Sequence, residues 1–337
     1  MNETFPLGKL PADFLAHLLS QAPIKDSRVM YGPGIGLDCA VIDLGERLLV
    51  FKSDPITFAT DNIGWYAVQV NANDIATTGA APRWMLATLL LPEKTSTRTT
   101  VEKIFADLYS AAADLGISVV GGHTEITYDL RRPVLVGTLI GEVERDRLIA
   151  PDKVQPGDRL LITKGVPIEG TALLAREFPH KLFGVLKQDE LEAAQQFLFK
   201  PGISVVRDAK IAMHAGSVHA MHDPTEGGLA GALWELSEAS RRRLVIDPTA
   251  VLIPELSRRI CEVFAINPLA SIASGALLLA AAQEDANSIQ AALNEEGIPC
   301  ADIGWVDEGA PGVWQTAGSP LLRPDRDEIA RVYEEMG

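Results

Sequence analysis

The chain has 337 residues, of which 47% are hydrophobic and 22% charged, a composition typical of soluble globular proteins. At roughly 150 residues per domain, this length predicts two domains. The 45 acidic residues exceed the 30 basic ones, and the resulting net charge of −15 argues against a protein that coats nucleic acid.

The first half of the chain predicts an alternation of strands and helices. Residues 1–30 contain a short amphipathic helix, in which Phe14, Leu15, Leu18 and Leu19 are spaced for one face. A loop with three glycines is expected next, over 32–36, followed by a hairpin of Ala40–Leu44 and Leu48–Lys52. The predicted helices are Gly64–Thr78 and Thr99–Leu115. The further predicted strands are Trp84–Leu91, Ile117–Val120 and Val134–Val143. We expect residues 31–150 to form one α+β domain with its helices on one face of a sheet.

Pro156 and Gly157 make residues 152–158 the best candidate for a domain boundary, so we expect a second domain over 151–337. Its predicted strands are Arg159–Thr163, Val218–Met221, Ala276–Ala281 and Ile303–Val306. Its predicted helices are Pro167–Phe178, Gln188–Leu198, Ile203–His214, Leu229–Ser240 and Ala286–Glu296.

The cysteines Cys39, Cys261 and Cys300 are far apart and form no CxxC pair. This pattern suits a reducing compartment and offers no zinc ligand set. The first residues lack the basic and apolar character of a signal peptide, and the longest apolar stretch, residues 270–282, is too short to span a bilayer. We therefore expect a cytoplasmic protein without membrane or nucleic-acid partners.

Three carboxylates of the first half stand near the predicted elements: Asp38 before the first strand, Asp54 after the second, and Asp74 in the helix. If the strand ends face one edge, Asp38 and Asp54 come together, and two such charges about 4 Å apart repel by about 4 kcal/mol at an effective dielectric of 20. A converging set therefore needs a cation, and oxygen ligands favour Mg²⁺ over zinc. The spacing alone also fits three separate surface or capping aspartates.

Two glycine motifs could approach an anion. Gly121-Gly122-His123-Thr124 follows a short apolar strand, where two glycines allow backbone N–H groups to reach a phosphate, although an ordinary tight turn has the same composition. The motif from Asp223 to Gly228 stands between a strand and a helix start, where N–H donors could bind a phosphate or a carboxylate. Thr225 could equally be a simple helix cap. His219 and His222 have no further His or Cys nearby, which argues against zinc.

Five segments together resemble the aminoimidazole-ribonucleotide (AIR) synthetase-like superfamily. They are GLDCAV over 36–41, SDP over 53–55, NDIATTGA over 73–80, GGHT over 121–124 and HDPTEGGL over 222–229. The resemblance covers nearly the whole chain, and the last segment is most similar to the hydrogenase-maturation carbamoyl dehydratase branch. Other branches are thiamine-monophosphate kinase, whose Asp-rich acceptor signature is not found here, and selenophosphate synthetase.

The resemblance implies a homodimer in which the mixed sheets of the N-terminal domains pair into a barrel, with an α/β sandwich as the C-terminal domain. It implies binding of ATP with Mg²⁺ and transfer of the γ-phosphoryl group to a small-molecule or carbonyl/amide oxygen. The resemblance implies that Asp38, Asp54 and Asp74 bind the metal ion. It implies that the same three aspartates bind the nucleotide together with Asn73, Gly121, Gly122 and Thr124. It implies catalytic roles for Asp223 and His123.

Several positions depart from the family pattern. Cys39 stands where a second acidic residue is usual, and His123 stands where the kinase and dehydratase branches have Asp. The dehydratase has Lys at the position of Glu125 and Glu at that of Ser274, and it ends in a Cys that carries the carbamoyl group, whereas this sequence ends in Met336-Gly337. These differences predict a divergent paralogue. The alternative hypothesis is a nucleotide-binding or assembly protein that keeps the fold without turnover.

Overall fold

The structure, a computed structural model, describes residues 5, 10–34, 36–57 and 61–336. Two compact units make up the chain. The N-terminal unit comprises residues 23–33 and 37–148, and the C-terminal unit comprises residues 149–337 together with 1–22 and 34–36. The expected helix near the N-terminus is present as α1 (Ala12–Leu19) and belongs to the C-terminal unit.

A six-stranded mixed sheet forms the N-terminal unit, in the order β1-β2-β3-β6-β4-β5. Its strands are β1 (Val29–Tyr31), β2 (Ala40–Asp43), β3 (Arg47–Ile56), β4 (Ala81–Pro92), β5 (Ser118–Thr127) and β6 (Val134–Glu144). Neighbouring strands are antiparallel except for β4 and β5, which are parallel. The predicted hairpin is confirmed by the pairing of β2 with β3.

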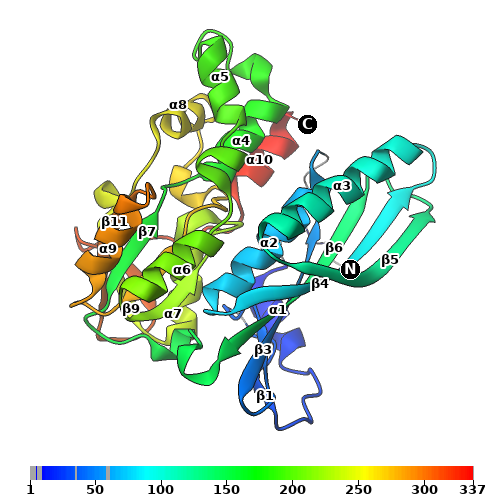
Figure 1. Cartoon of the computed structure of the whole chain (residues 1–337). Coiled ribbons are helices and arrows are strands. Elements are labelled where there is room, and N and C mark those ends of the chain that lie inside the picture. The colour runs from blue at the N-terminus through cyan, green and yellow to red at the C-terminus, as the bar shows by residue number, and fades with distance from the viewer. Residues whose placement is uncertain (1–4, 6–9, 35, 58–60, 337) are drawn as a thin grey trace, which may run out of the picture. The chain divides into compact units, whose positions relative to one another are not determined.

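Helices α2 (Ile63–Thr77) and α3 (Arg98–Asp114) lie along one face of this sheet, as Figure 1 shows. Thr97 caps α3, because its side chain accepts a hydrogen bond from the Thr100 N–H. Nearly every residue of α2 is buried, since α2 packs against the sheet on one side and against α3 on another. The predicted single helical layer is therefore confirmed.

The C-terminal unit contains a second six-stranded sheet in the order β12-β9-β11-β7-β10-β8. Its strands are β7 (Arg159–Thr163), β8 (Val218–His222), β9 (Arg243–Ile246), β10 (Leu278–Ala281), β11 (Cys300–Asp307) and β12 (Gly312–Gln315). Its longer helices are α4 (Ile168–Glu177), α5 (Gln188–Gln195), α6 (Val206–Ala215), α7 (Gly228–Ser240), α8 (Glu255–Phe264), α9 (Ala286–Glu295) and α10 (Glu328–Met336).

Continuous burial along the central strands shows that both faces of this second sheet are covered. All four residues of β10 and four of the five residues of β7 are buried. On one face, Leu160 and Ile162 of β7 pack with Leu233 of α7 in the main core. A separate apolar core, which includes Leu174 and Phe264, joins α4, α5, α8 and α10.

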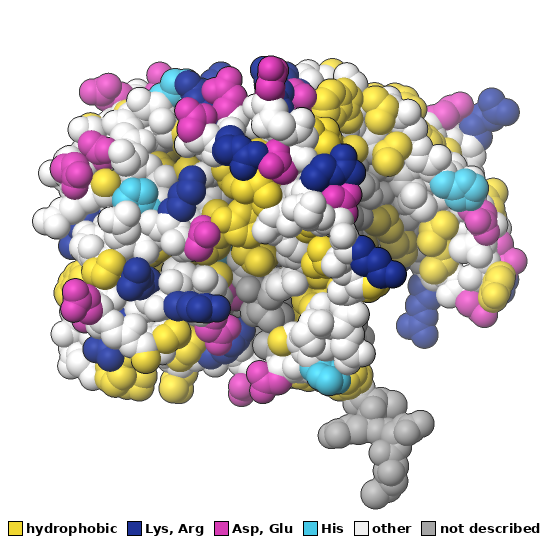
Figure 2. Space-filling view, turned by 90° about the horizontal axis from the view of Figure 1, so that it is seen from below, with side chains coloured by type: hydrophobic (Ala, Val, Ile, Leu, Met, Phe, Trp, Pro, Cys, Tyr) yellow, Lys and Arg dark blue, Asp and Glu magenta, His cyan; other side chains and the backbone are white. Residues whose placement is uncertain are grey.

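No helix within the described residues is both long and apolar enough to cross a membrane. On the face drawn in Figure 2, Lys and Arg side chains lie scattered among Asp and Glu side chains, rather than gathered into one basic patch.

Candidate functional site

Three aspartates of the N-terminal unit surround the side-chain amine of Lys52. Lys52 Nζ lies 3.0 Å from Asp74 Oδ2, 3.2 Å from Asp54 Oδ2 and 4.0 Å from Asp38 Oδ1. These four residues are called the carboxylate cluster below. The three carboxylates thus gather around one point, and they are not the separate surface groups that the spacing alone allowed.

Strand alternation and the position of α2 build the carboxylate cluster. Leu48, Val50, Lys52 and Asp54 are alternate residues of β3, so their side chains share one face of the sheet. Leu48 and Val50 are fully buried on that face, and α2 packs against β3 and carries Asp74. Asp54 lies inside β3, which continues to Ile56, so the prediction that it follows the strand is wrong.

The charge of Lys52 depends on its neighbours. Its side chain is only 12% exposed, and the Asp74 side chain is 4% exposed. Burial alone lowers the pKa of the Lys52 amine, but the carboxylates of Asp74, Asp38 and Asp54 outweigh burial and hold that pKa well above its usual value. Lys52 is therefore a permanent cation in this structure.

Further contacts hold the aspartates in position. The side-chain oxygen of Asn71 accepts a hydrogen bond from the Asp54 backbone N–H (3.1 Å), and its amide nitrogen donates to the Ala67 carbonyl (2.8 Å). The buried Cys39 thiol donates to the Asp74 carbonyl (3.4 Å). Sequence reasoning missed Lys52 and Asn71, although the Lys-x-Asp spacing on a predicted strand could have revealed Lys52. Asn73, predicted to contact nucleotide, is fully buried on α2.

The motif from Gly121 to Thr124 lies inside strand β5, so it neither follows the strand, as predicted, nor forms the tight turn that its composition also allowed. Gly122 has φ +143°, and a Cβ at this position would lie 1.9 Å from the Ala87 carbonyl oxygen on the paired strand β4. This glycine is therefore required by the close approach of β4 and β5. His123 is exposed on the same strand, and its Nε2 lies 3.4 Å from Glu125 Oε2.

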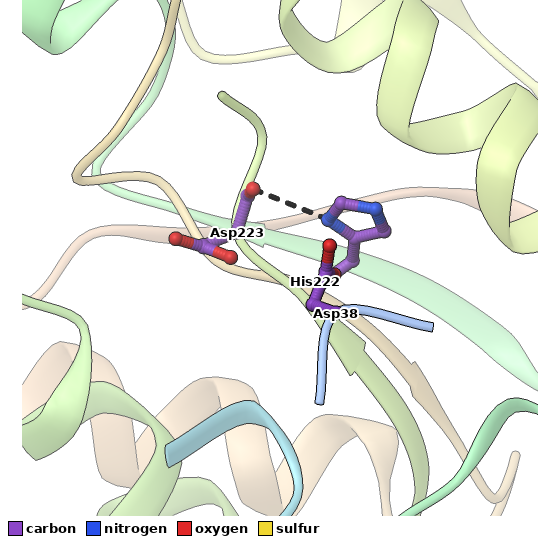
Figure 3. Close-up of side chains that lie close together, drawn as sticks. All are labelled: Asp38, His222 and Asp223. Carbon is purple, nitrogen blue, oxygen red and sulfur yellow. Dashed lines mark hydrogen bonds between the residues drawn. The ribbon is translucent and has the colours of Figure 1, made fainter. Parts of the chain in front are cut away.

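In the C-terminal unit, residues 223–227 form the glycine loop between β8 and α7, which begins at Gly228. The side chain of Asp223 is buried, and His222 Nδ1 donates to the Asp223 backbone oxygen (3.2 Å), as Figure 3 shows. Thr225 is not the helix cap that the sequence allowed, because Gly227, with φ +83°, takes the N-cap position of α7. Gly228 has φ +60°, and a Cβ there would lie 2.5 Å from the Ser271 carbonyl oxygen.

The two histidines of β8 contact different carboxylates. His219 Nδ1 lies 2.8 Å from Asp158 Oδ2, and His222 Nε2 lies 2.9 Å from Glu235 Oε2. Each imidazole thus has its own acidic partner within the C-terminal unit.

Two buried carboxyl groups belong to the surroundings of the glycine loop. Asp327 accepts hydrogen bonds from the backbone N–H groups of Gly227 (2.7 Å) and Ile329 (2.8 Å), and burial raises its pKa to about 6. Burial raises the pKa of Glu169 to about 7, although the hydroxyl of Ser274 donates a hydrogen bond to it. Sequence reasoning found neither carboxyl group, because their contacts join segments about 100 residues apart.

We expect Glu169→Gln to stabilise the protein more at pH 8 than at pH 5. Because the folded pKa of Glu169, about 7, exceeds its ordinary value of 4.5, the stability of the wild type falls as the pH rises between these values. A shift of this size corresponds to about 3 kcal/mol. Denaturant unfolding at both pH values measures the difference, with Glu177→Gln, at the exposed end of α4, as the control. An equal effect of Glu169→Gln at both pH values would contradict the assignment.

Each of the two units contains a segment that matches the profile of a known protein family. The profile of the N-terminal domain of AIR synthase related proteins matches residues 36–143, and the profile of their C-terminal domain matches residues 155–314. Together the two matched segments account for most of the chain. The carboxylate cluster lies in the first segment and the glycine loop in the second.

Individual relatives are similar over most of their length. A putative hydrogenase expression/formation protein of Methanocaldococcus jannaschii is 27% identical over 293 residues, which cover 83% of each chain. The crystal structure of the hydrogenase maturation protein HypE in complex with ATP has a TM-score of 0.69 at 24% identity and covers 94% of this chain and 91% of its own. The thiamine-monophosphate kinase AaThiL, complexed with AMPPCP and TMP, has a TM-score of 0.72 at 20% identity, with 93% and 94% covered.

Proposed function

The chain belongs to the AIR synthase-related family, and on this premise we propose that it is an ATP-dependent enzyme that transfers the γ-phosphoryl group to an oxygen acceptor. The acceptor would be a small molecule or a carbonyl or amide oxygen. The carboxylate cluster carries this proposal, because three carboxylates that gather around one point suit a nucleotide bound with a divalent cation. The relatives crystallised with ATP and with AMPPCP support the same conclusion.

The donor set of the cluster fits Mg²⁺, because Asp38, Asp54 and Asp74 supply carboxylate oxygens and already gather around a cation. These three residues would hold the ion. Bound Mg²⁺ supplies positive charge that offsets the charge of the phosphate oxygens. Asn71 keeps the β3 backbone in place at Asp54 through its hydrogen bond to the Asp54 N–H.

The remaining nucleotide contacts are assigned to the residues that the family pattern indicated. Asn73 lies fully buried on the same helix as Asp74, so the contact is assigned to Gly121, Gly122 and Thr124 of β5, which would lie near the phosphates of the nucleotide. In the transfer, the acceptor oxygen forms a bond to the γ-phosphorus while the bond from that phosphorus to ADP breaks, and ADP leaves with the electron pair. Asp223 would receive the acceptor proton, and His123 would contact the transferred group.

Product formation separates this proposal from the alternative, a nucleotide-binding or assembly protein without turnover. We expect wild-type protein with Mg·ATP to release ADP when a panel of alcohol, carboxamide and carbamoyl compounds is supplied. Asp223→Asn should lose this release while keeping ATP binding. ATP binding without ADP from any acceptor would favour the non-catalytic alternative.

We also propose that two copies of the chain pair through β5. This strand is an edge of its sheet, and it exposes Val120 (57%) and Ile126 (62%) beside its unpaired backbone. We expect light scattering to give the mass of a dimer for the wild type and that of a monomer for Ile126→Glu. Leu44→Glu, at an exposed position outside β5, is the control. A wild-type monomer, or a dimer that survives Ile126→Glu, would contradict this interface.

A further inference from the structure

Lys52 occupies the place in the carboxylate cluster that a cation would take. Its Nζ lies within 4.0 Å of a carboxylate oxygen from each of the three aspartates, and its side chain is 12% exposed. An ammonium group and a divalent ion at this point would repel each other, because a single charge and a double charge about 4 Å apart interact by about 2 kcal/mol even in bulk water. The amine and a metal ion therefore cannot both occupy the centre of the three carboxylates, so a metal ion that joins the cluster has to bind these carboxylates beside the amine.

A second buried lysine shows how the cluster differs from an ordinary buried ion pair. Lys164 of the C-terminal unit lies 3.1 Å from Asp208 Oδ2 and donates to the Ser204 carbonyl at 2.6 Å. That lysine and its carboxylate are balanced one to one. In the carboxylate cluster one ammonium faces three carboxylates, so these four side chains keep a surplus of two negative charges.

We propose that Lys52 is a built-in counter-cation that takes the place of one divalent ion, so that the cluster accepts a single Mg²⁺, which arrives with the nucleotide. The surplus of two negative charges matches one divalent ion. In the absence of nucleotide the amine holds the three carboxylates together, and the protein has little affinity for a free divalent cation. The inference rests on the proposed function for the role of Mg·ATP, but the part that concerns Lys52 is measurable without nucleotide.

The test measures how tightly nucleotide-free protein binds Mn²⁺ alone. Electron paramagnetic resonance of the free ion gives the bound fraction. Lys52→Met should bind Mn²⁺ at least about tenfold more tightly than the wild type, because the repelling charge is gone and three carboxylates remain. Mn²⁺ should also raise the melting temperature of Lys52→Met and leave that of the wild type unchanged. Lys52→Arg, which keeps the charge, should behave as the wild type does.

Two further variants test whether a gain of Mn²⁺ affinity comes from the carboxylate cluster. Lys103→Met removes a lysine that pairs with Asp107 on α3, outside the cluster, and should gain no Mn²⁺ affinity. Lys52→Met/Asp54→Asn removes a carboxylate as well, and it should lose the gain. If Lys52→Met is not obtained folded, Lys52→Gln is measured by the same criterion.

Folded Lys52→Met or Lys52→Gln with wild-type Mn²⁺ affinity would overturn the inference. A Mg²⁺-dependent ATP response in the wild type, together with that result, would leave the proposed function standing. A gain of Mn²⁺ affinity in Lys52→Met, in a protein whose wild type does not respond to Mg·ATP, would support the role of Lys52 and count against the proposed function.

Discussion

Asp74→Asn should weaken Mg²⁺-dependent ATP binding by about 100-fold or more, which corresponds to about 2.8 kcal/mol. The change removes the negative charge of a buried carboxylate that lies 3.0 Å from Lys52 and that we assign to Mg²⁺. An amide oxygen is a weaker ligand for a hard cation than a carboxylate is. Isothermal titration calorimetry with ATP in excess Mg²⁺ measures the loss.

The control for this variant is Asp107→Asn. Asp107 also pairs with a lysine in the N-terminal unit, at 2.6 Å from Lys103, but the pair lies on α3 and is exposed. Asp107→Asn should therefore leave the affinity for ATP unchanged. Unchanged affinity in folded Asp74→Asn would show that the carboxylate cluster is not the nucleotide-metal site.

Gly64→Ala should destabilise the N-terminal unit by about 3 kcal/mol. A Cβ at Gly64 would lie 2.2 Å from the Ile104 carbonyl oxygen and 2.7 Å from the Leu108 backbone nitrogen, so α2 and α3 would have to move apart. Because α2 carries Asn71 and Asp74, this movement would also disturb the carboxylate cluster. Chemical denaturation followed by circular dichroism measures the loss of stability.

Gly231→Ala is the matched control, because Gly231 is also inside a helix, α7. The nearest neighbour of a Cβ there is the Glu226 carbonyl oxygen at 3.4 Å, which leaves room for a methyl group. Alanine favours a helix over glycine by up to about 1 kcal/mol, so this variant should be neutral or slightly more stable. Equal destabilisation by the two substitutions would contradict the assignment of Gly64 to a close helix contact.

Periodicity in the sequence predicted the main elements well. Helices α2 and α3 and strand β4 begin and end within a few residues of their predicted bounds, because each has a long apolar pattern and a clear glycine or proline limit. Strand β5 was predicted too short. Its exposed residues, including Gly121 and Gly122, lack the apolar pattern of a strand, and only its pairing with β4 makes it one.

The candidate site could be predicted only in part. The spacing allowed Asp38 and Asp54 to come together but fitted three separate aspartates as well, and only the family resemblance implied that Asp38, Asp54 and Asp74 form one metal site. Neither identified Lys52 as the cation among them in the structure. A lysine on a strand usually reaches solvent, but strand alternation places Lys52 on the face of β3 against which α2 packs. Glu169 and Asp327 were missed for a related reason, since their burial depends on contacts between distant segments.

Thermal unfolding of the wild type with Mg·ATP, with Mg·ADP, and with ATP plus a chelator tests whether the protein binds ATP together with Mg²⁺. A ligand at about 100 times its Kd adds about 2.7 kcal/mol of stability, which is visible as a higher melting temperature. We expect an increase of the melting temperature with Mg·ATP that disappears with the chelator and in Asp74→Asn. The same melting temperature under all conditions would contradict this expectation, because the family fold would then be present without its nucleotide site.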